Sequence, residues 1–227
     1  MIIYVTGTNT DVGKTVATAA LASAFKQRGR EVVYAKPLQT GEPEGKGDAA
    51  TVGKLAGVEI AEMVRFPEPL APNLSARRAG MGQPSLQELK EWIAALDAPG
   101  RVVLVEGAGG LLVRLTDAYT LADVADKLLI VTSLNLGSLN AAELTVREAQ
   151  RRGIEVLGLV GGSLPADPDL ATRLNLEEMP EVTGCTFWGS LPEGMARMAP
   201  AEFARVPRKS TRTLSSTPSS ATSQRQR

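Results

Sequence analysis

Short apolar runs alternate with longer amphipathic segments along this chain. The apolar runs are rich in β-branched residues and cover residues 2–6, 31–35, 101–105, 128–132 and 156–160. Continuous apolar runs of this length are typical of strands that are buried on both faces of a sheet. Apolar positions at helical spacing occur at residues 15–28, 49–56, 86–96, 138–152 and 168–176. The alternation predicts an α/β fold with helices on both faces of a mostly parallel sheet.

Residues at the segment boundaries support the predicted helices. Gly29 and Gly153 each follow a helical segment and suit C-terminal caps, and Ser85 with Glu88 matches a capping box. In open parallel sheets, ligands bind at the carboxyl ends of the strands. Functional residues are therefore expected directly after each predicted strand.

The first predicted strand leads into residues 7–15, Gly-Thr-Asn-Thr-Asp-Val-Gly-Lys-Thr, and then into a helical segment. A chance occurrence of Gly-Lys-Thr is the alternative, but the order strand, glycine-bearing loop and helix is typical of a phosphate-binding loop. Gly7 lies one residue earlier than the motif G-x-x-x-x-G-K-[ST] requires. This departure limits the subfamilies of phosphate-loop proteins to which the chain could belong. Lys14 is expected to reach the β- and γ-phosphates of a nucleotide, and the Thr15 hydroxyl to hold Mg²⁺.

The second predicted strand is followed by residues 36–41, Lys-Pro-Leu-Gln-Thr-Gly. The proline and the glycine predict an irregular loop in which Lys36 and Thr40 face the phosphate site. The alternative for Lys36 is a solvated surface lysine. Asp48 lies where the next helix could begin, so it is an N-cap, a Mg²⁺ ligand or both.

The next predicted strand ends at residues 106–110, Glu-Gly-Ala-Gly-Gly. An acid at the end of a buried strand, followed by glycines that let the backbone approach a ligand, suits a metal-binding carboxylate, although an acid in a flexible turn is the alternative. Thr15, Asp48 and Glu106 together supply the oxygen ligands that Mg²⁺ uses beside phosphate and water. Residues 136–140, Leu-Gly-Ser-Leu-Asn, lead into a helix whose first N–H groups could bind a carboxylate.

Composition limits the chemistry that the chain can perform. With 227 residues, of which 43% are hydrophobic and 22% charged, the chain is expected to form one soluble domain over residues 1–206. The formal net charge of zero gives no indication of a nucleic acid or an anionic membrane as partner. The absence of histidine excludes Ser-His and Cys-His mechanisms and the usual zinc sites, and the single cysteine, Cys185, excludes an intramolecular disulfide.

The sequence also bears on membrane spans, targeting signals and the C-terminal segment. No apolar stretch reaches the roughly 18 residues that a membrane span needs, and the N-terminus has no signal-peptide pattern, so a cytoplasmic protein is expected. Residues 207–227 include ten Ser or Thr and few apolar side chains, which predicts a disordered Ser/Thr/Arg-rich tail. Contact of its arginines with nucleic acid or an anionic surface is the alternative.

Taken together, these motifs resemble the dethiobiotin synthetase family, whose members close the ureido ring in biotin synthesis. The matching segments are 7–15, 36–41, 48–49, 106–110 and 136–140, in the family's order and spacing. The extra residue between Gly7 and Gly13 is also a feature of that family. The resemblance implies a P-loop NTPase-type three-layer sandwich and a cyclo-ligase that depends on ATP and Mg²⁺.

The resemblance also implies the reactants and the steps. One amine of 7,8-diaminopelargonate captures CO₂ as a carbamate, and a carbamate oxygen attacks the γ-phosphate of ATP. The second amine then closes the ring and releases phosphate, giving dethiobiotin and ADP. Cations must neutralise the charge on the transferred group, and none of these steps needs histidine. A homodimer with the substrate at the subunit interface is implied as well.

Roles for individual residues follow from the same resemblance. Lys14 and Lys36 are the expected catalytic residues, with Lys36 bridging the carbamate and the γ-phosphate. The expected substrate-binding residues are Thr10, Lys36, Thr40, Leu139 and Asn140. The two threonines position the diamine end, whereas the last two residues bind the carboxylate of a substrate held by the other subunit. The expected nucleotide-binding residues are Asp11, Val12, Gly13, Lys14, Thr15, Val16, Asp48, Glu106, Gly107, Ala108, Gly109, Gly162, Ser163, Pro192, Glu193 and Gly194.

One segment departs from the family pattern. Many members carry an asparagine after the strand near Val160 that reads the adenine edge, whereas residues 161–165 here are Gly-Gly-Ser-Leu-Pro. Residues 191–194 fit the family's second base-side loop. Weak discrimination among nucleotides is therefore expected.

Two other classes of protein remain as alternatives. A regulatory partitioning-type P-loop ATPase shares the fold, but it usually carries a lysine at the position of Thr8 and an aspartate at that of Glu106. The amide-ligase domain of cobalamin-pathway synthetases needs a glutamine-hydrolysing domain, which neither the length of this chain nor its lack of histidine allows. The residues thus favour the ring-closing ligase.

Overall fold

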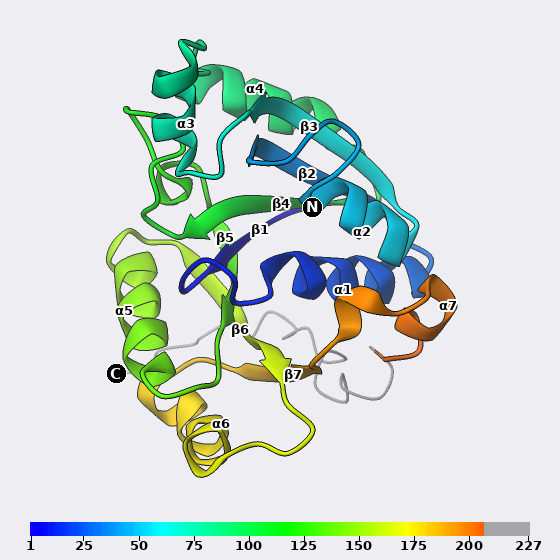
Figure 1. The fold of residues 1–227 in the computed structure, drawn as a ribbon, viewed down its shortest axis with the longest axis vertical. Coiled ribbons are helices and arrows are strands. Elements are labelled where there is room, and N and C mark those ends of the chain that lie inside the picture. Colours follow the sequence, from blue (N-terminus) through cyan, green and yellow to red (C-terminus); the bar gives the residue numbers. More distant parts are fainter. Residues whose placement is uncertain (207–227) are drawn as a thin grey trace, which may run out of the picture.

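The computed structural model describes residues 1–206, which form a seven-stranded sheet (Figure 1). The strands are β1 (Ile2–Gly7), β2 (Glu31–Thr40), β3 (Glu59–Phe66), β4 (Arg101–Gly110), β5 (Lys127–Thr132), β6 (Glu155–Leu164) and β7 (Phe187–Pro192). Their spatial order is β3-β2-β4-β1-β5-β6-β7, and each pairing between them is parallel. The predicted tail, residues 207–227, lies outside the described residues.

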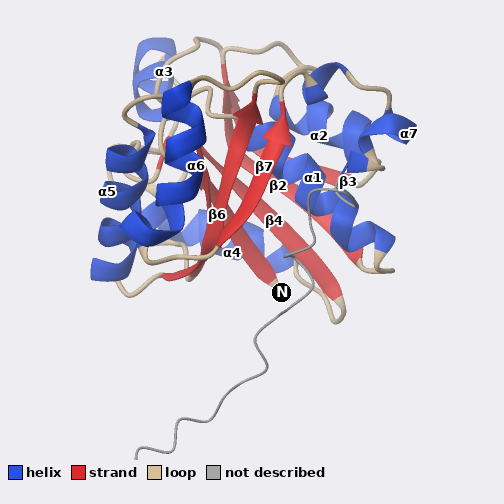
Figure 2. Ribbon diagram, turned by 90° about the horizontal axis from the view of Figure 1, so that it is seen from below, coloured by secondary structure: helices blue, strands red, loops and turns tan. Residues whose placement is uncertain are grey.

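Helices cover both faces of this sheet (Figure 2). On one face lie α1 (Lys14–Gln27), α2 (Asp48–Ala56) and the short α7 (Pro200–Phe203). On the other lie α3 (Pro72–Ala79), α4 (Leu86–Leu96), α5 (Ser138–Arg151) and α6 (Leu170–Thr183). Short 3₁₀ helices, Leu121–Asp123 and Met195–Arg197, lie in two connections. The predicted α/β class, with a parallel sheet between two helical layers, is confirmed.

The two cores follow from the alternation of side chains along each strand. Tyr4 and Val105 face the core under α4 and α5, whereas Val5 and Leu104 face the core under α1 and α2. Because both faces are covered, the central strands are apolar throughout, which is why the apolar runs were visible in the sequence.

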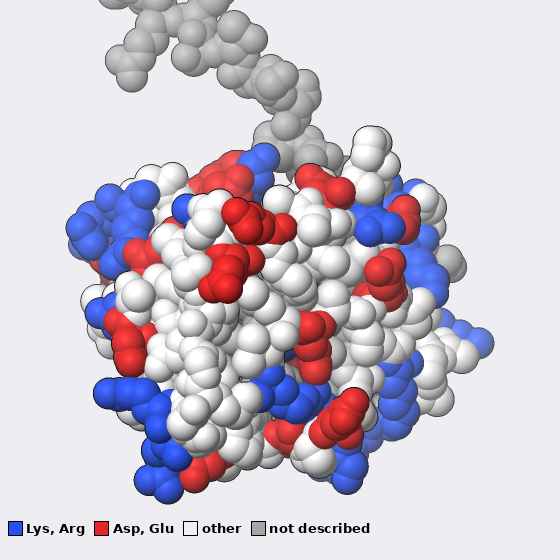
Figure 3. Space-filling view, turned by 90° about the horizontal axis from the view of Figure 1, so that it is seen from above, with Lys and Arg blue, Asp and Glu red and all other residues white. Residues whose placement is uncertain are grey.

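Within residues 1–206, no helix combines the length and apolar character needed to cross a membrane. On the face shown in Figure 3, acidic and basic side chains are interspersed around a broad uncharged area.

The helix boundaries predicted from capping residues are confirmed. Ser85 and Glu88 form a capping box at the start of α4. Gly29 and Gly153 directly follow the C-cap residues of α1 and α5, with φ angles of 75° and 74°. These backbone angles lie in the left-handed region that glycine adopts without strain.

The prediction of an irregular loop at residues 36–41 was wrong, because β2 continues to Thr40. The register of β2 with β4 ends at Ala35↔Val105, whereas its register with β3 continues through Lys36↔Glu62 to Thr40↔Phe66. After Ala35, the described part of β2 pairs with β3 and no longer with β4. Pro37 has no N–H, and a proline is tolerated where a strand pairs on one side only. The position of Lys36 is consequently fixed by a sheet rather than by a loop.

Other elements were missed or were longer than expected. β3 and β7 lie at the two edges of the sheet, and β3 mixes charged and apolar residues because much of it is exposed. The eight-residue α3 begins with Pro72 at its first position and was also not predicted. α6 runs to Thr183 and contains Pro180, so the predicted end at residue 176 was too early.

Candidate active site

The phosphate loop connects the central strand to α1. Gly13 is the N-cap of α1 with a φ of 91°, and a Cβ atom there would lie 2.7 Å from the Gly162 carbonyl oxygen. Asp11 also has a positive φ, of 58°. Among the described residues no side chain caps the start of α1, so its first N–H groups are available to an anion. The loop thus has the conformation and the donors that phosphate binding requires.

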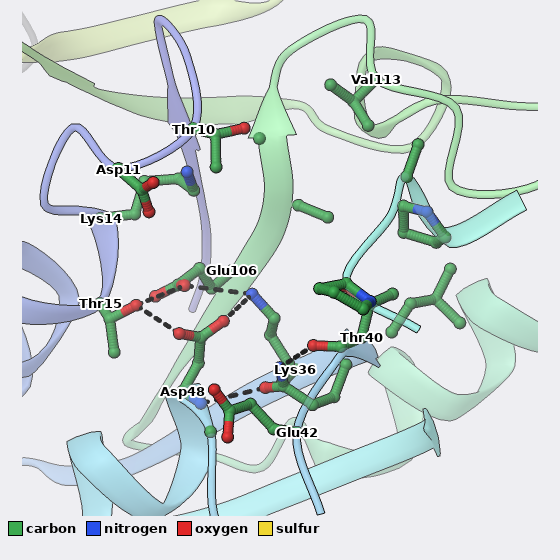
Figure 4. A pocket seen from close by; sticks show the side chains of 18 of the residues that line it. Thr10, Asp11, Lys14, Thr15, Lys36, Thr40, Glu42, Asp48, Glu106 and Val113 are labelled. Carbon is green, nitrogen blue, oxygen red and sulfur yellow. Dashed lines mark hydrogen bonds and ion pairs between the residues drawn. The ribbon is translucent and has the colours of Figure 1, made fainter. Parts of the chain in front are cut away.

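Four side chains from separate elements meet beside this loop (Figure 4). The Lys36 ammonium on β2 lies 2.5 Å from Asp48 Oδ2 at the start of α2 and 3.2 Å from Glu106 Oε1 on β4. It also donates to the Gly107 carbonyl oxygen at 3.0 Å. The Thr15 hydroxyl on α1 lies 2.7 Å from Asp48 Oδ1 and 3.2 Å from Glu106 Oε1. The adjacency of β2 and β4, under α1 and α2, brings these distant residues together.

The charges in this cluster stabilise one another. Lys36 is 3% exposed, and its burial alone would lower its pKa. The carboxylates of Glu106 and Asp48 more than offset that effect, so the pKa of Lys36 is raised above its usual value. Burial would likewise raise the pKa of Asp48, but the charge and hydrogen bond of Lys36 hold that pKa below its usual value. At neutral pH, Lys36 is therefore cationic and Asp48 anionic.

Lys14 supplies a second cation next to the cluster. Its side chain is buried, and its ammonium donates to the Asn9 carbonyl oxygen at 3.2 Å. Burial lowers the pKa of Lys14, and the negative charge of Glu106 opposes this shift. Lys14 and Lys36 thus place two lysine side chains beside the free N–H groups of α1.

The oxygen atoms of Thr15, Asp48 and Glu106 fit a Mg²⁺ ion that is bound together with phosphate. All three are hard oxygen ligands, and Thr15 contacts both carboxylates. Within residues 1–206, no group of three or more His, Cys, Asp or Glu side chains could hold a metal. A Mg²⁺ ion held here would take phosphate oxygens and water as its further ligands, as is usual at nucleotide sites.

The cluster lies in a cavity of about 950 Å³ whose lining contains both polar and apolar residues. Besides the cluster itself, the polar lining residues include Thr10, Lys14 and Thr40. The apolar lining residues are Val16, Leu38, Pro69, Leu70, Ala71, Pro72, Ala108 and Val113. One cavity can therefore hold both a phosphate group and an alkyl chain.

A second cavity, of about 260 Å³, lies on the other side of the phosphate loop. Its wall comes from that loop, from the segment after β5, from the end of β6 and the residue that follows it, from α6, and from the residue after β7. The lining residues are Asp11, Val12, Ser133, Leu134, Asn135, Ser163, Pro165, Thr172 and Glu193. Its place beside the phosphate loop suits the base or ribose of a nucleotide.

Most of the residues expected from the sequence line these two cavities. The larger cavity is lined by Thr10, Asp11, Gly13, Lys14, Thr15, Val16, Lys36, Thr40, Asp48, Glu106, Ala108 and Gly109. Of the expected base-side residues, Ser163 and Glu193 line the smaller cavity, together with Asp11 and Val12 of the phosphate loop. The remaining expected residues, Gly107, Gly162, Pro192, Gly194, Leu139 and Asn140, line neither cavity.

The expectation that Asp48 could be an N-cap was wrong, because Gly47 is the N-cap of α2 and Asp48 is its first helical residue. The Asp48 side chain points instead to Lys36 and Thr15.

Gln39, which no motif argument singled out, accepts a hydrogen bond from the Asp48 N–H at 3.0 Å and donates to the Thr40 carbonyl oxygen at 3.0 Å. It is 4% exposed and holds the start of α2 in place of a local cap.

Comparisons with known proteins identify the family. A family model described as an AAA domain matches residues 2–200. A curated relative from Corynebacterium diphtheriae, ATP-dependent dethiobiotin synthetase BioD, is 57% identical over 209 residues, covering 90% of this chain and 94% of the relative. The chain belongs to the dethiobiotin synthetase family. A relative of the same name from Streptomyces coelicolor is 49% identical, over 89% of this chain and 88% of its own length.

Solved structures share the fold of this synthetase family member at low identity. The septum site-determining protein MinD with Mg-ADP from Pyrococcus horikoshii has a TM-score of 0.60 at 16% identity, covering 94% of this chain and 95% of that one. The MinC:MinD cell division complex of Aquifex aeolicus has a TM-score of 0.59 at 15% identity, covering 97% of this chain and 98% of that one. At such identities the likeness shows the fold alone. The partitioning-type alternative is thus a distant structural neighbour, whereas the dethiobiotin synthetases are close relatives in sequence.

Position 162 of this dethiobiotin synthetase family member has no room for a side chain. A Cβ atom on Gly162 would lie 1.6 Å from the Val12 carbonyl oxygen. The glycine therefore lets β6 pack directly on the phosphate loop. An asparagine cannot be placed at this position without moving that loop.

Weak discrimination among nucleotides is accordingly predicted. We expect kcat/KM for ATP, GTP and CTP, measured with saturating diaminopelargonate and bicarbonate, to differ by less than about 10³-fold, because Gly162 stands where an amide side chain would read the adenine edge. Gly162→Asn should lower turnover with all three nucleotides without creating a preference for ATP. Gly82→Asn is the matched control, since a Cβ atom there meets open space. A larger preference for ATP would mean that another segment, such as the one around Glu193, reads the base.

Proposed function

We propose that this chain converts 7,8-diaminopelargonate, CO₂ and ATP into dethiobiotin, ADP and phosphate. The observation that carries the proposal is the Lys36 ammonium, which lies in the same cavity as both the phosphate loop and an apolar wall, 3.2 Å from Glu106 Oε1. A cation in this position can contact a group that is bound to the substrate on one side and to the phosphate donor on the other. A carbamate that attacks the γ-phosphate is such a group.

The shape and lining of the cavity support a substrate with an alkyl chain. Diaminopelargonate has vicinal amines at one end, a carboxylate at the other and an apolar chain between them. The side chains of Leu38, Leu70 and Val113 can bury that chain, and burial of each CH₂ contributes about 0.8 kcal/mol. Thr10 and Thr40 lie in the wall of the same cavity, where their hydroxyls can bond to the amines.

In the phosphoryl-transfer step, the chain supplies position and positive charge. Lys14 and the N–H groups of α1 neutralise the β- and γ-phosphates, and Lys36 binds the attacking carbamate oxygen and the γ-phosphate. The three N–H groups of Lys36 are directed at Asp48, Glu106 and the Gly107 carbonyl oxygen. A reacting oxygen must displace one of them, and we infer that it is Asp48, whose side chain is 32% exposed.

Thr15, Asp48 and Glu106 would hold Mg²⁺, which when bound neutralises phosphate charge. In the last step the second amine attacks the carbonyl carbon of the carbamic-phosphoric anhydride, and phosphate leaves with the electrons of the broken C–O bond. Since the chain contains no histidine, the proton released from the amine goes to a carboxylate, a phosphate oxygen or water.

We further propose a homodimer in which the α5 N-terminus of one subunit binds the carboxylate of a substrate held by the other. Leu139 and Asn140 lie at the start of α5, where no side chain of the described residues caps the helix. Leu136 and Leu144 in the same region are 85% and 60% exposed, which supports an apolar contact with a second copy. Sedimentation is expected to give twice the chain mass, and Leu136→Asp to yield monomers with a raised KM for diaminopelargonate. A monomeric unaltered protein with full activity would contradict the dimer.

ATP turnover with and without 7,8-diaminopelargonate tests the function directly. ADP and phosphate are expected to form when the diamine and bicarbonate are both present, with one dethiobiotin per ADP by mass spectrometry. A regulatory ATPase would instead hydrolyse ATP without the diamine and respond to DNA or a membrane. Turnover that is indifferent to the diamine would refute the proposal.

A further inference from the structure

Two hydroxyls on one face of α1 are directed at the same carboxylate. Thr15 and Thr18 are three residues apart and therefore neighbours on the helix surface. The Thr15 hydroxyl lies 3.2 Å from Glu106 Oε1, and the Thr18 hydroxyl lies 2.8 Å from Glu106 Oε2. Glu106 Oε2 is thus bound to the Thr18 hydroxyl, whereas Glu106 Oε1 shares the Thr15 hydroxyl with Asp48 Oδ1, which lies closer, at 2.7 Å. Thr15 belongs to the phosphate-loop motif, whereas Thr18 lies outside every motif discussed above.

The Thr18 hydroxyl has two acceptors within reach. Its oxygen lies 2.9 Å from the Lys14 carbonyl oxygen, one helical turn back, and 2.8 Å from Glu106 Oε2. A hydroxyl has a single hydrogen, and a bond to a carboxylate is roughly twice as strong as a bond to a neutral carbonyl. The hydrogen is therefore directed at Glu106. Thr18 is 0% and Glu106 1% exposed, so bulk water cannot take the place of this donor.

The Glu106 carboxylate requires such a restraint because the last torsion of a glutamate side chain is broad and has no sharp minimum. With Oε2 bound to Thr18, Oε1 is directed at the Thr15 hydroxyl and the Lys36 ammonium, each at 3.2 Å. Rotation of the carboxylate would lengthen both of these contacts.

We propose that Thr18 is a positioning residue that orients Glu106 Oε1 toward Thr15 and Lys36, and thereby sets the affinity of the site for a divalent cation. The inference rests on the metal-binding role proposed above for Glu106. Thr18 itself contacts neither phosphate nor substrate in this scheme and acts through the carboxylate.

Variants of the full chain separate the hydroxyl from the packing of this side chain. Thr18→Ala removes the hydroxyl, and Thr18→Val replaces it with a methyl group that at 2.8 Å from Oε2 would also press on the carboxylate. Thr18→Ser keeps the hydroxyl. Thr183→Val is the matched control, because Thr183 is a buried threonine on α6 whose hydroxyl donates to the Met179 carbonyl oxygen one turn back, at 2.7 Å.

The affinity for Mn²⁺ in the presence of ADP, measured by the paramagnetic resonance of free Mn²⁺, is the main readout. It is expected to fall about tenfold or more in Thr18→Ala and Thr18→Val, as for other residues that orient a metal ligand. The Mg²⁺ concentration for half-maximal turnover should rise in parallel, while kcat at saturating Mg²⁺ falls less. Thr18→Ser and Thr183→Val should bind Mn²⁺ like the unaltered protein. Circular dichroism shows which variants are folded. If Thr18→Val does not fold, the test relies on Thr18→Ala.

An unchanged Mn²⁺ affinity in Thr18→Ala would overturn the proposal. An equal loss in Thr18→Ser would also overturn it, because the effect would then come from packing rather than from the hydroxyl. The binding measurement contains no diamine, so its outcome is independent of whether the proposed ring closure is correct.

Discussion

Replacement of Lys36 by alanine is expected to lower kcat by on the order of 10²-fold or more. The ammonium is buried between Asp48 and Glu106, and its raised pKa keeps it charged throughout the neutral range. Loss of this charge removes a group that stabilises negative charge only as the phosphoryl group is transferred. Single-turnover formation of ADP with saturating ATP, diamine and bicarbonate measures the effect on chemistry directly.

Lys36→Ala is also expected to lower the free energy of unfolding, because Lys36 forms ion pairs with Asp48 and Glu106. Removing one partner of a buried ion pair typically costs about 3–5 kcal/mol, because the remaining charge is left buried. The fold is expected to persist with a lower free energy of unfolding, and Lys36→Met, which keeps the alkyl chain, should be inactive in the same way. Lys54→Ala, at an exposed position of α2, is the control for the loss of a lysine. Activity close to that of the unaltered protein in either Lys36 variant would exclude its catalytic role.

Asp48→Asn and Glu106→Gln are expected to raise the Mg²⁺ concentration for half-maximal turnover by about 10- to 100-fold or more. Each change removes a hard anionic ligand, and loss of a residue that only supports a ligand already costs that much. Glu106→Gln should have the larger effect, because its side chain is fully buried and solvent cannot replace the lost oxygen, whereas Asp48 is partly exposed. The measurement is the rate as a function of free Mg²⁺ at fixed ATP.

These two variants also have an internal control. Glu44→Gln alters an exposed carboxylate in the connection between β2 and α2 and should leave the Mg²⁺ dependence unchanged. If neither Asp48→Asn nor Glu106→Gln shifts the Mg²⁺ dependence, then neither carboxylate belongs to the metal site. A shift in Glu106→Gln alone would leave Asp48 as the partner of Lys36 only.

Part of the site was predictable because its geometry is local. The phosphate loop is a continuous segment, so the order of strand, glycines, Lys14 and Thr15 is visible in the sequence. Asp48 and Glu106 could also be proposed, because residues at the carboxyl ends of parallel strands must lie at one edge of the sheet. Their pairing with Lys36 depends on β2 and β4 being neighbours, and that adjacency is a property of the sheet order.

Other features could not be read from residue patterns. Gln39 and Thr18 hold Asp48 and Glu106 in place through hydrogen bonds across 9 and 88 residues of sequence, and neither has a distinctive local motif. The extension of β2 through Pro37 was missed because a proline normally ends a strand, and its tolerance depends on where the β4 register stops. The edge strands were missed because exposed faces dilute their apolar pattern.

The sequence by itself determined the class of fold, the phosphate loop and the family to which the chain belongs, because these reside in periodicity and in short contiguous motifs. The tertiary structure alone decided that Lys36 lies on a strand between two carboxylates, and that Gly162 packs on the Val12 carbonyl. It also decided that the polar cluster and the apolar wall share one cavity. The physical reason is that distances between side chains on different strands follow from sheet order and helix packing, which no local pattern encodes.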